Sequence, residues 1–240
     1  MSVSLTNLNQ VSYLEFKSEK ANSLSLEMLN QISKSIDELK DDNKVLVIKS
    51  GGEKAFSAGA NFDEFEKIST NKEALDYFSG FIKVLNSIRK TESIVICRVH
   101  GKAVGGAVGL ISACDYVFAL EKAELKLSEL SIGIGPFTIS PALERKIGKA
   151  HLSEMLLDSE WKDSNWASRV GLFNKIFKDL KNLDLALQDF SDHLCKQSKN
   201  TLSENRKLLW DGTQDWPELM QKRAKVVSEL LINSKCSDVK

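Results

Sequence analysis

Several features that mark special classes of protein are scarce in this sequence. Its 240 residues carry 33 basic and 33 acidic side chains, so there is no formal net charge. Such a balance gives the chain no overall attraction to nucleic acid or to an anionic membrane. Cysteines are few and lie far apart without C-x-x-C spacing, at Cys97, Cys114, Cys195 and Cys236. This spacing argues against a zinc ribbon and against a secreted disulfide scaffold. Cys97 and Cys114 lie in apolar runs, which indicates core thiols.

Long apolar runs are also missing. No stretch approaches the length that crosses a membrane, and the N-terminal MSVSLTNLNQVSYLEF has neither the basic segment nor the apolar core of a secretory leader. We therefore expect a soluble, cytoplasmic protein without a membrane partner. A chain of this length suits one domain of moderate size, or one domain with a helical appendage, and can bury a substantial core.

Strand and helix patterns alternate through the first part of the chain. The pattern predicts a strand at 11–16, and apolar runs predict buried strands at 45–50 and 93–100, the last of them rich in β-branched residues. A helix with regularly spaced apolar residues follows Ser25, a plausible N-cap. From residue 141 the pattern is almost wholly helical apart from LFNKIF. This order predicts an α/β core and a C-terminal helical part, from about residue 180, that packs on the core or on another subunit.

Two loops of small residues each follow a buried strand and precede a helix. The first contains SAGA at 57–60, and the second contains GG at 105–106 before the apolar helix AVGLISAC. In a parallel sheet such loops lie at the same carboxyl edge, where ligands bind. Free N–H groups at a helix start suit an oxygen that carries negative charge. A dinucleotide-binding loop is a poorer interpretation, because the glycines do not follow G-x-G-x-x-G and lie in mid-chain.

In their order, these segments resemble the crotonase superfamily, that is, the enoyl-CoA hydratase/isomerase family. The likeness rests on AFSAGANFDEF, on VHGKAVGGAVGLISACDYVFALEKAELKLSELSIGIGP and on ANSLSLEML, and covers residues from about 10 to 180. It implies an α/β fold in which a spiral of ββα units at 1–180 binds acyl-CoA. The helical region 181–240 would mediate trimer contacts, in a homotrimer or a dimer of trimers. Coenzyme A is then part of the substrate, and no separate cofactor or metal is expected.

The resemblance assigns a chemical role to the two loops and to one carboxylate. The backbone N–H groups of Ala60 and Gly106 would form an oxyanion hole around the thioester carbonyl, with Gly105 beside them. The family places two glutamates beside the acyl chain. Here the second is Glu129, whereas the first position is Gly109. The sequence of these segments resembles most a bacterial branch of methylglutaconyl-type or general enoyl-CoA hydratases in which glycine replaces that first glutamate.

The same resemblance implies the substrate contacts. Ala21 and Ala58 match positions whose backbone groups hold the adenine of coenzyme A, and Lys20 is a candidate for a phosphate contact. Ile132 and Phe137 are expected at the acyl chain, because GIGPFTIS replaces a more glycine-rich segment and makes the pocket bulkier. His100 and Asp115 are interpreted as structural residues.

The missing glutamate leaves more than one function open. One carboxylate can remove a proton from C2 and return it at C4, so Glu129 alone suffices for a 3-enoyl to 2-enoyl-CoA isomerase. Hydration usually uses two carboxylates. We expect hydration of a straight or branched 2-enoyl-CoA, with isomerisation as the first alternative and a non-catalytic acyl-CoA-binding protein as the second. If Glu129 faces an apolar pocket, burial should raise its pKa toward neutrality.

Overall fold

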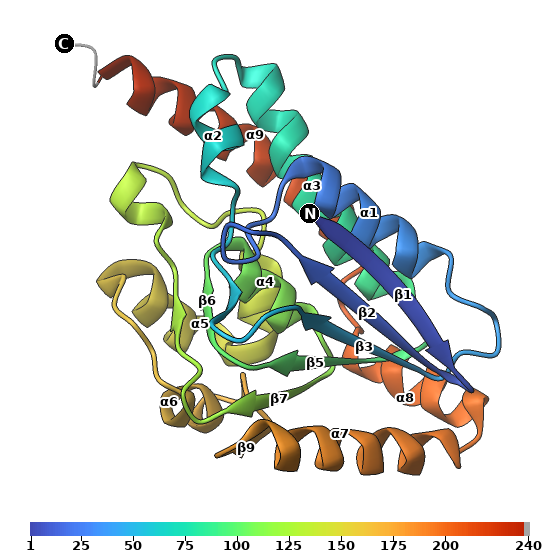
Figure 1. The fold of residues 1–240 in the computed structure, drawn as a ribbon. Helices are drawn as coiled ribbons and strands as arrows, with labels where there is room; N and C mark the ends of the chain where they lie inside the picture. Colours follow the sequence, from blue (N-terminus) through green and yellow to red (C-terminus); the bar gives the residue numbers. More distant parts are fainter. Residues whose placement is uncertain (238–240) are drawn as a thin grey trace.

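A six-stranded sheet forms the centre of the computed structural model, which describes residues 1–237 and the side chains of residues 1–235 (Figure 1). The side chain of Cys236 lies outside the described residues. In spatial order the strands are β1 (Ser2–Leu8), β2 (Val11–Lys17), β3 (Val45–Ser50), β5 (Ile94–Val99), β7 (Tyr116–Leu120) and β9 (Lys175–Phe177). The pair β1–β2 is antiparallel, and every other neighbouring pair is parallel.

A second sheet of short parallel strands lies at the carboxyl edge of the first. It contains β4 (Ala55–Ser57), β6 (Lys102–Val104) and β8 (Leu125–Lys126), in that order. The chain passes three times from a strand of the large sheet to a strand of the small sheet and then into helical structure. The helical segments are α2 (Phe62–Lys67) with α3 (Asn71–Lys90), α4 (Gly106–Ala113), and the 3-10 helix η1 (Glu129–Ile132) with α5 (Ser140–Asp158). This repetition confirms the predicted α/β fold of ββα units.

Helices cover both faces of the large sheet (Figure 1). On one face lie α1 (Leu26–Asp37), α3, α4 and α5; on the other lie α7 (Leu180–Cys195) and α8 (Lys199–Leu209). In β3, Leu46 and Ile48 belong to the first core and Val45 and Val47 to the second. Because both faces are buried, the strand reads as an unbroken apolar run. Cys97 and Cys114 are buried free thiols, as predicted.

Helix starts follow the sequence signals. The Ser25 hydroxyl accepts a hydrogen bond from the Met28 N–H at 3.1 Å, which confirms the predicted N-cap. Gly148, with φ of 70°, interrupts α5 and divides it into two helical segments. The sequence did not indicate β1. That strand is largely exposed at the sheet edge, and its position is set by its pairing with β2.

The C-terminal helices pack on their own chain. After α6 (Ser164–Arg169), α7 and α8 cover the sheet, and α9 (Trp216–Ser237) runs along α3. Five apolar residues of α9 are buried in the main core: Trp216, Met220, Ala224, Val227 and Leu231. Its apolar stripe is therefore covered within the chain. The predicted trimer contacts and the division at residue 180 stay predictions. None of the helices in residues 1–237 has the length and apolarity needed to span a membrane.

A buried ion pair connects α8 with the residue that precedes β7. The Arg206 Nε donates to the Asp115 Oδ2 at 2.8 Å, and the two side chains are 4% and 3% exposed. The Asp115 carboxylate also accepts hydrogen bonds from the Val95 N–H and the Trp210 indole N–H. The Arg206 guanidinium donates further to carbonyl groups at the C-terminal end of α3. These contacts confirm that Asp115 is structural.

Candidate active site

The small sheet brings the two loops side by side. Ser57 of β4 pairs with Ala103 of β6, so the segment that follows Ser57 lies next to the segment that follows Val104. Gly59 shows how close they come, because a Cβ added there would lie 2.5 Å from the Val104 carbonyl oxygen. Gly59 also has a φ of 81°, which favours glycine. The loop pair predicted from the sequence is therefore confirmed.

Two backbone N–H groups of these loops have no protein partner among residues 1–237. Leu24 pairs with the residues on either side of Ala60, through the Gly59 carbonyl at 2.7 Å and the Asn61 N–H at 3.1 Å. The N–H of Ala60 consequently points to the opposite side. Gly106 is the first residue of α4, where the helix offers its N–H no acceptor. Within residues 1–237, neither amide donates a hydrogen bond to another protein group.

Tyr77 of α3 holds the first loop in place. Its hydroxyl donates to the Leu24 carbonyl at 2.8 Å and accepts from the Asn61 N–H at 2.9 Å. Only 3% of this side chain is exposed, and burial raises the Tyr77 pKa above its usual range. The sequence gives no signal for this role of Tyr77, because an aromatic residue on the buried face of a helix is indistinguishable from an ordinary core residue.

An apolar cavity of about 290 Å³ opens beside the two amides. Ala58, Ala60, Gly105 and Gly106 contribute backbone to its wall, and Glu129 is the ionisable side chain on that wall among the described residues. The apolar side chains come from α2, α3, η1 and the segment before α5: Phe62, Phe65, Phe78, Phe81, Ile132, Ile134, Pro136 and Ile139. The four phenylalanines were not predicted, since their helical spacing also suits core positions.

Glu129 enters the cavity from the first position of η1, three residues beyond the end of β8. A Cβ added at Gly105 would lie 2.8 Å from the Glu129 Oε1, so this carboxyl lies directly on the glycine loop. The Glu129 Oε2 is buried and has no hydrogen-bond partner among the described residues. Burial raises the pKa of Glu129 to about 7, as expected from the sequence. A carboxyl with this pKa can both accept and donate a proton near neutral pH.

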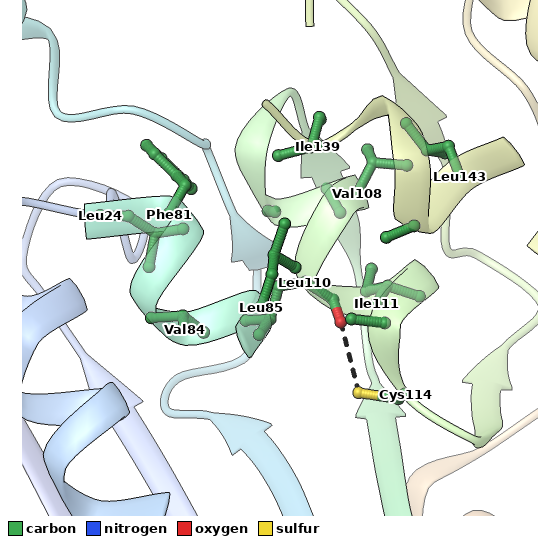
Figure 2. Packing of buried hydrophobic residues seen from close by; sticks show 14 of the residues in the cluster. Leu24, Phe81, Val84, Leu85, Val108, Leu110, Ile111, Cys114, Ile139 and Leu143 are labelled. Carbon is green, nitrogen blue, oxygen red and sulfur yellow. Dashed lines mark hydrogen bonds between the residues drawn. The ribbon is translucent and has the colours of Figure 1, made fainter. Parts of the chain in front are cut away.

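The first glutamate position of the family is closed here. A Cβ added at Gly109 would lie 2.5 Å from both the Cβ and the Cγ2 of Ile139. Ile139 is 2% exposed and lies over α4 near Val108 (Figure 2). A side chain at position 109 therefore has no room while Ile139 keeps this position.

Gly109→Ala is expected to destabilise the protein by about 1–3 kcal/mol, because overpacking forces the Ile139 side chain or the backbone to shift. Combining Gly109→Ala with Ile139→Gly should remove the clash, because glycine lacks both the Cβ and the Cγ2 that the added methyl group meets. The double variant should therefore be less destabilised than the sum of the two single variants. Urea denaturation of the four proteins in this cycle measures the coupling. Strict additivity would show that the two positions do not compete for space.

Only some of the remaining residues that were predicted to contact the substrate line the cavity. Ala58 and Ile132 lie on the cavity wall, whereas Phe137 is not part of it and packs against Gly135. Ala21 accepts a hydrogen bond from the Ala58 N–H at 2.9 Å, which joins the two segments expected at the adenine. Lys20 forms an ion pair with Asp63. The roles of these residues toward coenzyme A stay predictions.

His100 is consistent with a structural residue. It is 1% exposed, and burial lowers its pKa to about 4, so its imidazole is neutral near pH 7. No group of three or more histidine, cysteine or acidic residues in the described part of the chain is arranged to hold a metal ion.

Fold and site together define a class of protein: a ββα spiral whose apolar cavity sets one buried carboxyl beside two unpaired backbone amides. The model of the enoyl-CoA hydratase/isomerase family matches residues 6–230. The chain belongs to this family and is an enzyme of it.

Individual relatives agree with this assignment. The chain is 29% identical over 204 residues to the "Probable enoyl-CoA hydratase" of Bacillus subtilis, covering 84% of this chain and 79% of that protein. It is 32% identical over 174 residues to the mitochondrial methylglutaconyl-CoA hydratase of Rattus norvegicus, covering 71% and 55%. The crystal structure of an enoyl-CoA hydratase from Bacillus halodurans superposes with a TM-score of 0.85 at 20% identity, covering 97% and 94% of the two chains. That structure shows the shared fold.

Proposed function

We propose that this enzyme binds an acyl-CoA thioester and adds water to a 2-enoyl-CoA. The thioester oxygen would accept hydrogen bonds from the N–H groups of Ala60 and Gly106, and the acyl chain would occupy the apolar cavity. The observation that carries this proposal is Glu129, a buried carboxyl with a pKa of about 7 next to two unpaired amides. The relatives of this chain in Bacillus subtilis and Rattus norvegicus are named as hydratases, which supports hydration as the reaction.

The residues present can account for every atom of the hydration. The Glu129 carboxylate takes a proton from water, whose oxygen forms a bond to C3 of the enoyl group. The electron pair of the double bond moves toward the thioester oxygen, where the two amides stabilise the developing charge. The protonated Glu129 then returns its proton to C2, which yields a 3-hydroxyacyl-CoA and restores the carboxylate. A single carboxyl with a pKa near neutrality suits both proton transfers.

Isomerisation of a 3-enoyl-CoA is a second candidate, favoured by the contact between Gly109 and Ile139. Because this contact leaves no room for a second carboxylate, water has one charged partner on the described cavity wall. In the isomerisation, Glu129 removes a proton from C2 and returns it at C4. The oxyanion contacts and the proton carrier are the same, so the two reactions differ in whether water enters.

Product analysis separates these candidates. The purified protein would be given straight and branched 2-enoyl-CoA and 3-enoyl-CoA esters, with chromatography to resolve hydrated from isomerised products. We expect 3-hydroxyacyl-CoA from the 2-enoyl esters. Conversion of 3-enoyl to 2-enoyl-CoA without hydrated product would instead establish the isomerase. Tight binding of these esters with turnover of none of them would contradict both reactions.

We also propose that the enzyme is a homotrimer or a dimer of trimers. Exposed apolar side chains on the last two helices support contacts with further copies of the chain: Leu208, Leu209, Val226 and Leu230. Light scattering after size-exclusion chromatography would measure the mass in solution. A monomer at micromolar concentration would contradict the proposal.

A further inference from the structure

The C-terminal end of α9 lies against two segments that contribute to the cavity wall, through consecutive residues. Lys235 contacts α2, the helix that provides Phe62 and Phe65, and Ser234 lies beside Gly133, directly after η1. Figure 1 shows α9 passing α2 near the C-terminal end of the chain, although the two helices are far apart in the sequence. These contacts of Lys235 and Ser234 are separate from the two loops and from Glu129.

Lys235 satisfies the carbonyl end of α2. Its ammonium donates to the carbonyl oxygens of Phe65, Glu66 and Ile68 at 2.7, 3.0 and 2.8 Å. The same ammonium lies 5.5 Å from the centre of the Phe65 ring. The last carbonyl groups of a helix lack partners within the helix and carry partial negative charge, so a cation there is favourable.

Such a contact matters more for α2 than for a long helix. A helix of six residues is not stable by itself, so its position depends on tertiary contacts. Asn61 caps its start, and the Phe65 ring packs edge-on against Tyr77 and Phe78. The carbonyl groups at its end accept the hydrogen bonds of Lys235. Phe62, which is 59% exposed, stacks on Phe65, so movement of this end would displace both rings.

Ser234 lies close to the end of η1. A Cβ added at Gly133 would lie 3.2 Å from the Ser234 Cβ, so α9 leaves little space at this position. Gly133 has a φ of 74° and ends η1, whose first residue is Glu129. The end of α9 therefore lies against both α2 and the residue that follows η1.

We propose that Lys235 is a positioning residue for the acyl chain: by holding the end of α2, it fixes the width of the cavity between Phe65 and η1. This inference rests on the proposed acyl-CoA substrate. It assigns no part of the proton transfer to Lys235. Loss of the ammonium should weaken binding of the acyl chain and leave the binding of coenzyme A itself unchanged.

The test compares Lys235→Met, Lys235→Arg and the control Lys222→Met. Methionine keeps the apolar stem and removes the donor, whereas arginine keeps a cation. Lys222 is exposed on the same helix, about 20 Å earlier. Hydrogen exchange of residues 62–68 and titration calorimetry with coenzyme A, a four-carbon ester and a ten-carbon ester would be measured for each protein.

In Lys235→Met we expect about tenfold faster exchange at residues 62–68 and about tenfold weaker binding of the ten-carbon ester. Coenzyme A should bind as in the wild type, and the other two variants should resemble the wild type throughout. Unchanged exchange, or equal weakening for coenzyme A and both esters, would overturn the inference. If the wild type binds no acyl-CoA ester, the proposed function fails, whereas the exchange data still decide whether Lys235 holds α2.

Discussion

Glu129→Gln is expected to reduce turnover by about 10²–10⁴-fold, because glutamine keeps the shape of the side chain and cannot accept or return a proton. The same loss is expected for hydration and for isomerisation, since both use this carboxyl. Coenzyme A esters should still bind, because the two amides and the apolar wall are unchanged. Steady-state kinetics and calorimetry of the variant measure the two effects separately.

The pH dependence gives this prediction a second readout. Burial raises the pKa of Glu129 to about 7, and the ionised form is the base, so wild-type kcat/KM should rise with pH around 7. The residual activity of the variant should lack this limb. Glu66→Gln, on the exposed face of α2, is the matched control and should keep both the rate and the limb. A normal pH limb in Glu129→Gln would contradict the assignment of the base.

Stability should respond to the same carboxyl with a definite sign. Because the folded protein holds the Glu129 proton more tightly than the unfolded chain, the contribution of this group to stability falls as pH rises from about 4.5 to about 7. The wild type therefore keeps a buried negative charge at pH 8 at a cost in stability. Glu129→Gln should be more stable than the wild type at pH 8 and similar to it at pH 4.

Arg206→Met is expected to lower the free energy of unfolding by about 3–5 kcal/mol, because it leaves the Asp115 carboxylate buried without its cation. The loss also removes donors from the carbonyl groups of Ile88, Arg89 and Thr91 at the end of α3. Urea denaturation monitored by circular dichroism would measure the change. Kinetic constants of the folded fraction should stay near wild-type values, since this pair does not line the cavity.

An exposed control variant and a double variant test this prediction further. Arg169→Met removes an exposed arginine at the end of α6 and should cost less than about 1 kcal/mol. Arg206→Met combined with Asp115→Asn removes both charges and should recover part of the lost stability. If Arg206→Met were no more destabilising than the exposed control, the buried pair would not fasten α8.

The order of the main strands, the helix starts and the two glycine-containing loops could be predicted from the sequence. Ser25 and the apolar run at 45–50 are local signals, because capping and burial periodicity act over a few residues. The strands β4 and β6 could not be predicted, since three residues show no periodicity. Yet these two strands bring Ala60 and Gly106 together.

The sequence, through its resemblance to the family, indicated the candidate groups: the backbone amides of Ala60 and Gly106 and the carboxyl of Glu129. Only the tertiary structure decided which residues surround and support these groups. It closes position 109 with Ile139, supports the first loop with Tyr77 and holds α2 with Lys235. The physical reason is that capping and glycine conformation act locally. Steric exclusion, burial of a carboxyl and the hydrogen bonds of Lys235 depend on segments that meet only when the whole chain is packed.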